Sequence, residues 1–422
     1  MNKLITNIIW MLFEKITTIV GGIIITIYVA RYLGPNDMGI INYALALIAI
    51  LIPIAQLGAD KLFFNIIVKS SKSGVNIIHA TKFNRLIIYS ILSILITIYF
   101  YKYKSENISS LVLFLGIIIS GLFQAADIYK IYYDATLQSK INSIVTQFSL
   151  WTSLLSRLIL VKISAPLLFF SLPYILNSAI PYFIKSKIFN KKNNNTLNKK
   201  HKKKYSHYAT KAGIPLAVSS ISIIMYTRLN QIILAEYESL YDVGIYNAGL
   251  TLAQGWIFIP IAISTSLFAK VLKMEKKSKL NGYSFIFFIN IISSTPIIIL
   301  YFIFYNEIIL FTFGIDFIQS ESVILILTIT TLFSAIGGSA SRVIIAENGY
   351  IFIMYKTIIL TIINIILGIT LISNYGLIGA AYTSLITEIL GCIILNILFK
   401  KGLIILLIIK SIKNINFYKK LL

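Results

Sequence analysis

The sequence is poor in the residues that most enzymes and metal sites need. It has one cysteine, Cys392, which rules out a disulfide within the chain and a thiolate metal cluster. Its three histidines, His79, His201 and His207, have no metal-ligand spacing. We therefore expect no metal, no cofactor and no covalent chemistry, so that the protein is not an enzyme.

Charge is also scarce, since only 13% of the residues are charged, whereas 57% are hydrophobic and the mean hydropathy is +0.84. Such a chain is too apolar for a soluble fold. Only helices and closed barrels cross a bilayer, because its core offers no water to backbone amides. Long apolar runs such as 291–304 lack the alternation of a barrel strand. The sequence predicts an all-α, polytopic membrane protein.

Charged residues and breaks rich in Gly, Pro and Asn divide the apolar stretches into about twelve transmembrane helices. The predicted spans are 7–30, 38–60, 83–101, 108–128, 144–162, 166–185, 210–234, 243–269, 284–305, 320–342, 350–373 and 376–399. The first lacks a small-residue cleavage site, so we interpret it as a retained span. The run Leu403–Ile409 is too short to cross, and a membrane-surface helix is expected there.

The net charge of +23 comes from Lys and Arg in short segments beside the apolar runs. That distribution indicates membrane topology and argues against a nucleic-acid partner, which needs a compact basic face. The basic segments follow every second span, and the largest, Lys185–Lys211, lies at the midpoint of the chain. Because Lys and Arg favour the cytoplasmic side, both termini are predicted to be cytoplasmic. The midpoint segment is interpreted as a solvated loop near anionic lipid, with a partner site as the alternative.

The basic midpoint predicts two pseudo-symmetric six-helix bundles. The expected parts are an N-terminal bundle 1–186, a cytoplasmic linker 187–207, a C-terminal bundle 208–400 and a cytoplasmic or interfacial tail 401–422. An internal repeat supports this division, because Asp37–Asn42 recurs 205 residues later as Asp242–Asn247. Pro53 and Pro260 then follow at similar depth. A duplicated unit with an even number of spans gives parallel repeats.

Polar residues recur at helical spacing within five spans. They include Glu14, Thr17, Thr18 and Gly21; Gly116, Ser120, Gln124 and Asp127; Thr146, Ser149, Ser153 and Ser156; Thr227 and Gln231; and Asn247, Thr251 and Gln254. A hydrated cavity between the bundles would account for them together. The alternative, which we favour for the Ser, Thr and Gly positions, is close helix packing through small residues.

Two arginines, Arg157 and Arg228, lie several residues inside their spans, where a charge costs about 2.5–3.5 kcal/mol on insertion scales. A guanidinium group suits phosphate oxygens, so we predict that both bind an anion in the cavity. Pairing with a Glu or with the backbone, or snorkelling to the interface, is the alternative. Arg31 is a further candidate near a span end. The candidate polar or coupling residues are Glu14, Gln124, Asp127, Gln231, Asn247, Gln254 and Glu388.

Several segments carry a specific resemblance. They are Asn7–Lys15, Ala30–Pro35, Gly39–Ala44, Leu57–Asp60, Arg228–Leu234, Val243–Ala248 with Trp256 and Pro260, and Tyr375–Ala381. Together they resemble the Wzx-type polysaccharide flippases, which handle O-antigen repeat units, of the multidrug/oligosaccharidyl-lipid/polysaccharide exporter superfamily. The resemblance covers nearly the whole chain.

The resemblance implies twelve spans in two bundles of the bacterial inner membrane. It implies a flippase that moves undecaprenyl-diphosphate-linked oligosaccharide repeat units from the cytoplasmic to the periplasmic face by alternating access, as lipopolysaccharide biosynthesis requires. The implied partners are the lipid-linked oligosaccharide, inner-membrane lipids, a polysaccharide polymerase and a chain-length regulator. The chain departs from the family where Asn230 replaces a common Asp, Ala235 a Gly and Asn65 an Arg.

Two other classes of membrane protein would have a similar hydropathy profile. A multidrug or organic-cation antiporter of the same superfamily would have an acidic cavity, for which Glu14, Asp127 and Glu388 are candidates. A membrane polysaccharide polymerase usually has a large periplasmic loop, whereas the longest predicted loop here is the Lys-rich cytoplasmic one. A diphosphate and a glycan cannot cross hydrocarbon without a polar path, which favours the flippase.

Overall fold

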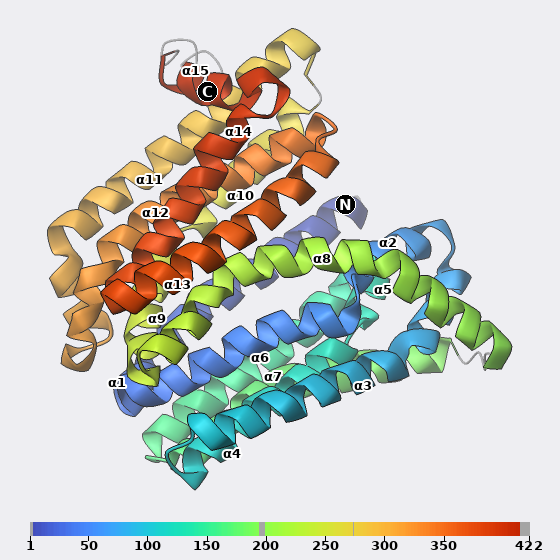
Figure 1. The fold of residues 1–422 in the computed structure, drawn as a ribbon. Helices are drawn as coiled ribbons and strands as arrows, with labels where there is room; N and C mark the ends of the chain where they lie inside the picture. Colours follow the sequence, from blue (N-terminus) through green and yellow to red (C-terminus); the bar gives the residue numbers. More distant parts are fainter. Residues whose placement is uncertain (1–2, 194–198, 273, 414–422) are drawn as a thin grey trace. The chain divides into compact units, whose positions relative to one another are not determined.

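The described part of the chain is helical throughout, as Figure 1 shows. The computed structural model describes the backbone of residues 3–193, 199–272 and 274–413. Side chains are described over the same ranges except for 3–17, 59–61, 199–204, 206, 208, 210–212, 215–216, 219, 269, 276–277 and 412–413. Two compact units make up the chain, unit 1 over Met1–Arg228 and unit 2 over Leu229–Leu422.

Both units consist of long helices joined by short turns. The elements from the N-terminus through unit 1 are α1 (Lys3–Gln56), α2 (Ala59–Lys69), α3 (Ser71–Tyr103), α4 (Ile108–Ala126), α5 (Tyr129–Ala135), α6 (Ser139–Lys162), the 3₁₀ helix η1 (Leu167–Ser171), α7 (Leu172–Lys192) and α8 (Lys199–Tyr237), which continues into unit 2. Those that follow are α9 (Leu240–Gln254), α10 (Phe258–Val271), α11 (Lys276–Thr312), η2 (Ile315–Ser320), α12 (Glu321–Ala346), α13 (Tyr350–Ile389), the π-helical turn η3 (Leu390–Ile394), α14 (Leu395–Ile397), η4 (Lys400–Gly402) and α15 (Leu403–Lys413).

Two of these helices, α1 and α13, each contain two predicted spans. Gly34 breaks α1 with φ of +76°, and Gly376 breaks α13 with φ of +51°. Glycine adopts such values without the steric cost that a Cβ imposes. Pro35, directly after the first break, has a φ suited to a helix start and no N–H to satisfy. The chain therefore turns back at single residues, with almost no loop.

Among the described residues, eight helices are long and apolar enough to cross a membrane, and α9 with α10 forms a ninth candidate that is bent by 42°. When α1 and α13 are divided at their glycines and α8 is included, the helices correspond to the twelve predicted spans. The prediction of an all-α, polytopic membrane protein is therefore confirmed.

The two units share a pattern of neighbours. In unit 1, α4 contacts α1, α3 and α7, and in unit 2, α12 contacts α9, α11 and α13. Each of these two central helices is the fourth span of its half of the predicted order. Asp37–Asn42 begins the second segment of α1, and Asp242–Asn247 lies in the first turns of α9. This common arrangement is what a duplicated bundle produces.

Small residues let the helices of unit 1 approach one another closely. A Cβ on Gly116 of α4 would overlap the side chain of Ser171, and one on Gly121 would overlap the hydroxyl of Tyr89. The Tyr89 hydroxyl donates to the carbonyl of Ile118 at 2.7 Å. Ser120 is fully buried on the same helix. Within α4, then, the predicted small-residue stripe is used for helix packing.

The boundary between the units lies inside α8, whereas the sequence suggested a division over 187–207. Helix α7 continues to Lys192 and α8 begins at Lys199, so most of that predicted linker is helical. The start of α8 packs in unit 1, where Ala209 joins a cluster with Phe63 and Phe189. Its last turns pack in unit 2, where Asn230 contacts α13. One continuous helix therefore contributes to both units (Figure 1).

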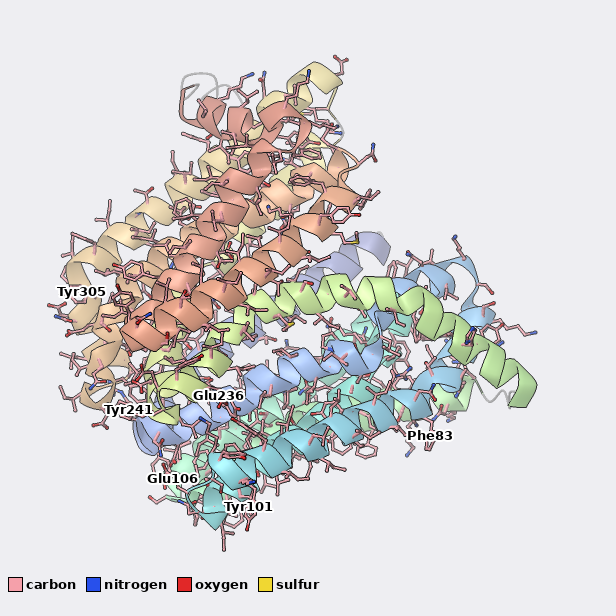
Figure 2. All side chains as sticks on the ribbon, viewed as in Figure 1. Phe83, Tyr101, Glu106, Glu236, Tyr241 and Tyr305 are labelled. Carbon is pink, nitrogen blue, oxygen red and sulfur yellow. The ribbon has the colours of Figure 1, made fainter. Side chains whose placement is uncertain are left out.

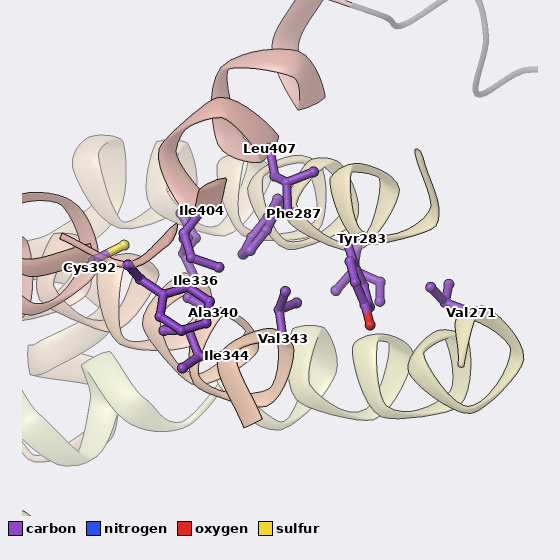
Figure 3. Close-up of a cluster of buried hydrophobic side chains, with 12 residues drawn as sticks. Val271, Tyr283, Phe287, Ile336, Ala340, Val343, Ile344, Cys392, Ile404 and Leu407 are labelled. Carbon is purple, nitrogen blue, oxygen red and sulfur yellow. The ribbon is translucent and has the colours of Figure 1, made fainter. Parts of the chain in front are cut away.

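The segment after the last span folds back as α15 against unit 2. Ile404 and Leu407 are buried in a cluster with Phe287 of α11 and Val343 of α12. Figure 3 shows Leu407 beside Phe287 in this cluster. Lys410 lies on an exposed part of the same helix. Leu406 and Ile409 are exposed on α15 as well, so apolar and basic side chains share its outer surface.

The turn back at Gly376 depends on a close approach at Gly379. A Cβ on Gly379 would overlap the carbonyl oxygen of Leu371. We expect Gly379→Ala to destabilise unit 2 by about 1–3 kcal/mol, as overpacking typically does. Gly337→Ala is the matched control, because its Cβ would meet no atom nearer than 3.8 Å. Thermal unfolding of the purified protein in detergent measures both, and equal loss in the two variants would contradict this explanation.

Candidate functional site

Unit 1 has two chemically different ends. Phe83 lies in the first half of α3 and Tyr101 near its C-terminal end, and both are exposed (Figure 2). At 1.5 Å per residue they are ~27 Å apart, close to the thickness of a bilayer core. Aromatic side chains favour the two membrane interfaces. We call the end with α2, α5 and the start of α3 the basic end, and the end with the turn between α3 and α4 the far end.

Arg85 of α3 lies just inside the basic end and is only 3% exposed. Its guanidinium group donates to the hydroxyl of Thr81, one turn earlier. Its Nε has no hydrogen-bond partner, and no described residue forms an ion pair with it. A buried cation without a counter-ion is costly, because burial removes its hydration. The basic end therefore holds an uncompensated positive charge.

A second cation and two tyrosines lie beside Arg85. The Nζ of Lys82 is 5.6 Å from the ring centre of Tyr182. Tyr129 and Tyr182 are neighbours of both Lys82 and Arg85. Tyr129 is buried in the aromatic cluster that closes this end, with Phe189 at a ring-centre distance of 5.0 Å. The group combines two positive charges with aromatic hydroxyls.

A small pocket opens next to Arg85. Its lining residues are Gln56, Leu57, Phe63, Thr81, Asn84, Arg85 and Ala209. The amide of Gln56 donates to the backbone oxygen of Gln124 at 3.2 Å, which joins α1 to α4 at this level. The wall is therefore polar on the side of α1 and α3 and apolar on the side of α2 and α8. With a volume of about 10 Å³ the pocket has room for no more than a water molecule in this conformation, so a phosphate group would need it to widen.

The predicted candidate Asp127 is already paired. Its carboxylate accepts from the Nζ of Lys185 at 2.9 Å, and the two side chains are 13% and 2% exposed. The Tyr133 hydroxyl donates to the backbone oxygen of Lys185, which fixes this part of α7. Asp127 is thus satisfied by a lysine from another helix. It does not neutralise Arg85.

Arg157 occupies the other part of unit 1, between one and two turns before the far end of α6. Its guanidinium carbon lies 4.3 Å from the ring centre of Tyr174 on α7, a cation–π contact. Its Nε has no hydrogen-bond partner, and no described carboxylate pairs with it. Nearby, the Tyr32 hydroxyl donates to the backbone oxygen of Ala165 at 3.0 Å. Arg157 is held by an aromatic face and keeps donors available for an anion.

The other predicted residues of unit 1 are placed differently. Arg31 and Arg228 are exposed, and each interacts with another group of the protein. Gln124 is exposed near the C-terminal end of α4. The side chain of Glu14 lies outside the described residues. Of the three predicted arginines, only Arg157 is a partly buried cation without a described polar partner.

In unit 2, the predicted amides bond to one another. The Nε2 of Gln231 donates to the Oδ1 of Asn247 at 2.9 Å, and Asn247 donates to the backbone oxygen of Val243 at 2.8 Å. Gln254 is exposed and ends α9 before the bend. This bond joins α8 to α9, while the buried Oε1 of Gln231 has no hydrogen-bond partner.

Asn230 lies in a second neutral network. Its Nδ2 donates to the hydroxyl of Ser384 at 2.8 Å, and Ser384 also bonds to the Tyr246 hydroxyl at 2.9 Å. Nearby on α13, Asn364 donates to Thr387 at 3.1 Å. An ionised Asp at 230 could only accept hydrogen bonds, whereas the Asn donates one here. The network is therefore built around the amide, and no carboxylate belongs to it among the described residues.

Glu388, also predicted as a candidate, is half-buried on the second segment of α13 and hydrogen-bonds with Ser334 of α12. Lys356 on the first segment of α13 acts on it electrostatically. Across the described residues, no group of His, Cys, Asp and Glu is arranged to hold a metal ion.

Three of the important cations, Arg85, Lys185 and Lys356, were not identified as site residues from the sequence. Arg85 and Lys185 lie at the edge of an apolar run, where a positive charge normally indicates topology. Lys356 lies inside its predicted span, about as deep as Arg157. The spacing of Thr81 and Arg85, one helical turn apart, was the available clue to Arg85.

Comparisons with known proteins agree with this architecture. A family model described as "Polysaccharide biosynthesis protein" matches residues 4–268. No curated protein matches the sequence. Among solved structures, an inward-facing MATE multidrug resistance transporter of the MOP superfamily is similar with a TM-score of 0.68 and 12% identity, covering 94% of this chain and 96% of that one.

Two further structures are similar over almost their whole length. The lipid II flippase MurJ, in an inward closed conformation, has a TM-score of 0.61 and 17% identity, with 97% of this chain and 91% of that one covered. A mutant of the MATE transporter VcmN of Vibrio cholerae has a TM-score of 0.55 and 12% identity, with 99% and 98% covered. At these identities the similarity shows the fold, which is that of MOP-superfamily transporters.

The Asp127–Lys185 pair gives a direct test of the electrostatics at the basic end. Lys185→Met leaves a poorly exposed carboxylate without its partner, so we expect a loss of roughly 3–5 kcal/mol of stability. Asp127→Asn in the same chain should recover most of that loss. A double-mutant cycle on thermal unfolding in detergent measures the coupling, and simple additivity of the two changes would contradict a direct pair.

Proposed function

Because the chain belongs to the polysaccharide biosynthesis protein family, we propose that it is a flippase for a lipid-linked oligosaccharide. Its substrate in this proposal is an undecaprenyl-diphosphate-linked repeat unit. The protein moves it from the cytoplasmic to the periplasmic face of the bacterial inner membrane by alternating access, without covalent chemistry. The MOP-superfamily fold supports a transport function of this kind.

One observation carries the proposal. Two guanidinium groups in the membrane part of unit 1, those of Arg85 and Arg157, have an Nε without a partner and no described counter-ion. Placing an arginine in such surroundings costs several kcal/mol unless an anion compensates it. A diphosphate supplies that anion, and its oxygens match the planar donors of arginine. The unpaired arginines are therefore explained as ligands for the phosphorylated head group.

The positions of the two arginines suggest an order of events. Arg85, Lys82 and the tyrosines lie at the basic end, which the positive-inside rule assigns to the cytoplasm. There they receive the diphosphate of a substrate made in the cytoplasm. Arg157 lies toward the far end and accepts the same charge later in the cycle. The lipid tail stays in the hydrocarbon, which solvates it at no cost.

The charge balance around Asp127 argues against a cation site at the basic end of unit 1. A cation carrier needs an unpaired carboxylate in its path, because the acid provides the attraction. In unit 1 the carboxylate of Asp127 already forms an ion pair with Lys185. The cations are in excess there, which favours an anionic substrate.

Replacing the two arginines tests the proposal. Arg85→Gln and Arg157→Gln each remove charged donors to phosphate, worth about 1.5–3 kcal/mol, so flipping should slow by about tenfold to a hundredfold. The Lys variants keep the charge and should be less impaired. Flipping is measured in proteoliposomes as the fraction of lipid-linked oligosaccharide that becomes accessible to an external glycan-cleaving enzyme.

Arg342→Gln is the matched control, since the Arg342 guanidinium already donates to Thr265 at 2.6 Å. It should flip at the wild-type rate. Wild-type rates in Arg85→Gln and Arg157→Gln, at equal protein level, would refute the assignment of the diphosphate to these residues.

A further inference from the structure

A hydrophobic groove opens at the surface of unit 1, between the neighbouring helices α3 and α4 (Figure 1). Its volume is about 320 Å³. The wall on α4 consists of Leu115, Ile118, Ile119 and Leu122. These residues are three or four positions apart, so they share one face of the helix. The groove is therefore a continuous apolar channel along α4.

The wall on α3 is formed by Tyr89, Ser93, Ile94, Thr97 and Ile98. Ser93 and Thr97 have short side chains, which leaves room beside α4. The polar groups on this wall are used within the protein, since the Tyr89 hydroxyl donates to the backbone oxygen of Ile118 at 2.7 Å and the Ser93 hydroxyl to that of Ser90 at 2.9 Å. A ligand in the groove meets mainly methyl groups and an aromatic ring.

The groove faces the lipid part of the membrane. Ile94 and Ile98 at its rim are each 58% exposed, and Ile119 on the opposite rim is 48% exposed. The exposed residues of α3 beside the groove, Ile91 and Leu95, are apolar too. A surface of this composition belongs in hydrocarbon rather than in a water-filled path. The occupant of the groove is therefore a hydrocarbon chain.

The groove crosses the middle of the membrane. Halfway between Phe83 and Tyr101, which mark the two interfaces, lies Leu92. At 1.5 Å per residue, Tyr89 is ~5 Å from this level toward the basic end, and Ile98 is ~9 Å from it toward the far end. Phospholipid tails end near the middle of a core that is ~30 Å thick. A polyprenyl chain is longer than one leaflet, so it can fill the groove from one side.

The groove begins beside the cations of the basic end. Tyr89 follows Arg85 by one helical turn, about 6 Å along α3. On the other wall, Leu122 precedes Gln124 by two residues. The backbone oxygen of Gln124 accepts from Gln56, which lines the small pocket at Arg85. Both walls of the groove therefore lead to the end at which the diphosphate is proposed to bind.

We propose that the groove between α3 and α4 binds the polyprenyl chain of the lipid-linked substrate while Arg85 and Lys82 hold its diphosphate. This inference rests on the proposed flippase function and adds the part of the substrate that the glycan does not provide. Binding comes from close packing, because lipid around the protein is as apolar as the groove itself. The chain enters from the side without leaving the hydrocarbon.

The first experiment fills the groove. Ser93→Phe and Thr97→Phe each place a ring in it, so purified full-length protein in detergent should bind undecaprenyl diphosphate about threefold to tenfold more weakly, as the loss of several dispersion contacts gives. Geranyl diphosphate has the same head group and a much shorter chain, so its affinity should stay unchanged in both variants. Arg85→Gln should weaken the binding of both ligands.

Leu95→Phe is the matched control, because Leu95 is 60% exposed on the same helix and lies outside the groove. It should bind undecaprenyl diphosphate like the wild type. Wild-type affinity in Ser93→Phe and Thr97→Phe, or an equal loss in Leu95→Phe, overturns the inference. Equal competition by phosphatidylglycerol would show that the groove holds bilayer lipid and would overturn it as well.

The second experiment needs no variant. Undecaprenyl diphosphate with a photoreactive diazirine in its chain should label the wild-type protein on peptides that contain Ile94, Ile98 and Ile119. Labelling confined to other helices overturns the inference, even where a groove variant fails to fold.

Flipping separates this inference from the proposed function. In proteoliposomes, Thr97→Phe should flip undecaprenyl-linked oligosaccharide several-fold more slowly than Leu95→Phe. Unchanged binding and unchanged flipping in the groove variants overturn the groove assignment and leave the flippase function intact. If the wild type flips no lipid-linked oligosaccharide, the proposed function fails, and chain binding and labelling still decide the groove.

Discussion

The lack of water in a bilayer core governs this structure, because every polar group inside a helix bundle has to find its partner within the protein. Most of them do. Thr328 and Thr331 of α12 donate to backbone oxygens one turn earlier, and Asn290 links Ser264 to Ser339. Against this background the few charged groups that are left over stand out. The proposed function follows from those exceptions.

The two units differ in which of their polar and charged groups lack a partner. Unit 1 has an excess of cations. Arg85 and Arg157 have no counter-ion among the described residues, and the carboxylate of Asp127 forms an ion pair with Lys185. Unit 2 keeps a neutral amide network around Asn230 and sets one carboxylate, Glu388, against one ammonium, Lys356. The excess of cations in unit 1 is the feature that binding of an anionic head group, as proposed, explains.

The sequence was sufficient for the fold because its strongest signals are local. The length of an apolar run predicts a membrane span, and the glycines at 34 and 376 predict where a helix turns back. Each of these signals lies within a short stretch of sequence. The site depends on contacts that no local pattern contains: Asp127 and Lys185 are 58 residues apart, and a single helix does not reveal that Arg85 is buried. Arg157 and Lys356 lie at similar distances from the ends of their predicted spans, so depth along an apolar run does not separate a cation that was identified from one that was missed.

The turns at the far end of unit 1 are minimal, since the chain reverses there at Gly34, over Lys104–Asn107 and over Ile163–Pro166. In unit 2, Gly376 reverses α13 in the same economical way. Within the described ranges these reversals leave no folded lobe outside the lipid. In the proposed orientation they face away from the cytoplasm. A soluble periplasmic protein that approaches them would find short turns and no folded lobe to bind.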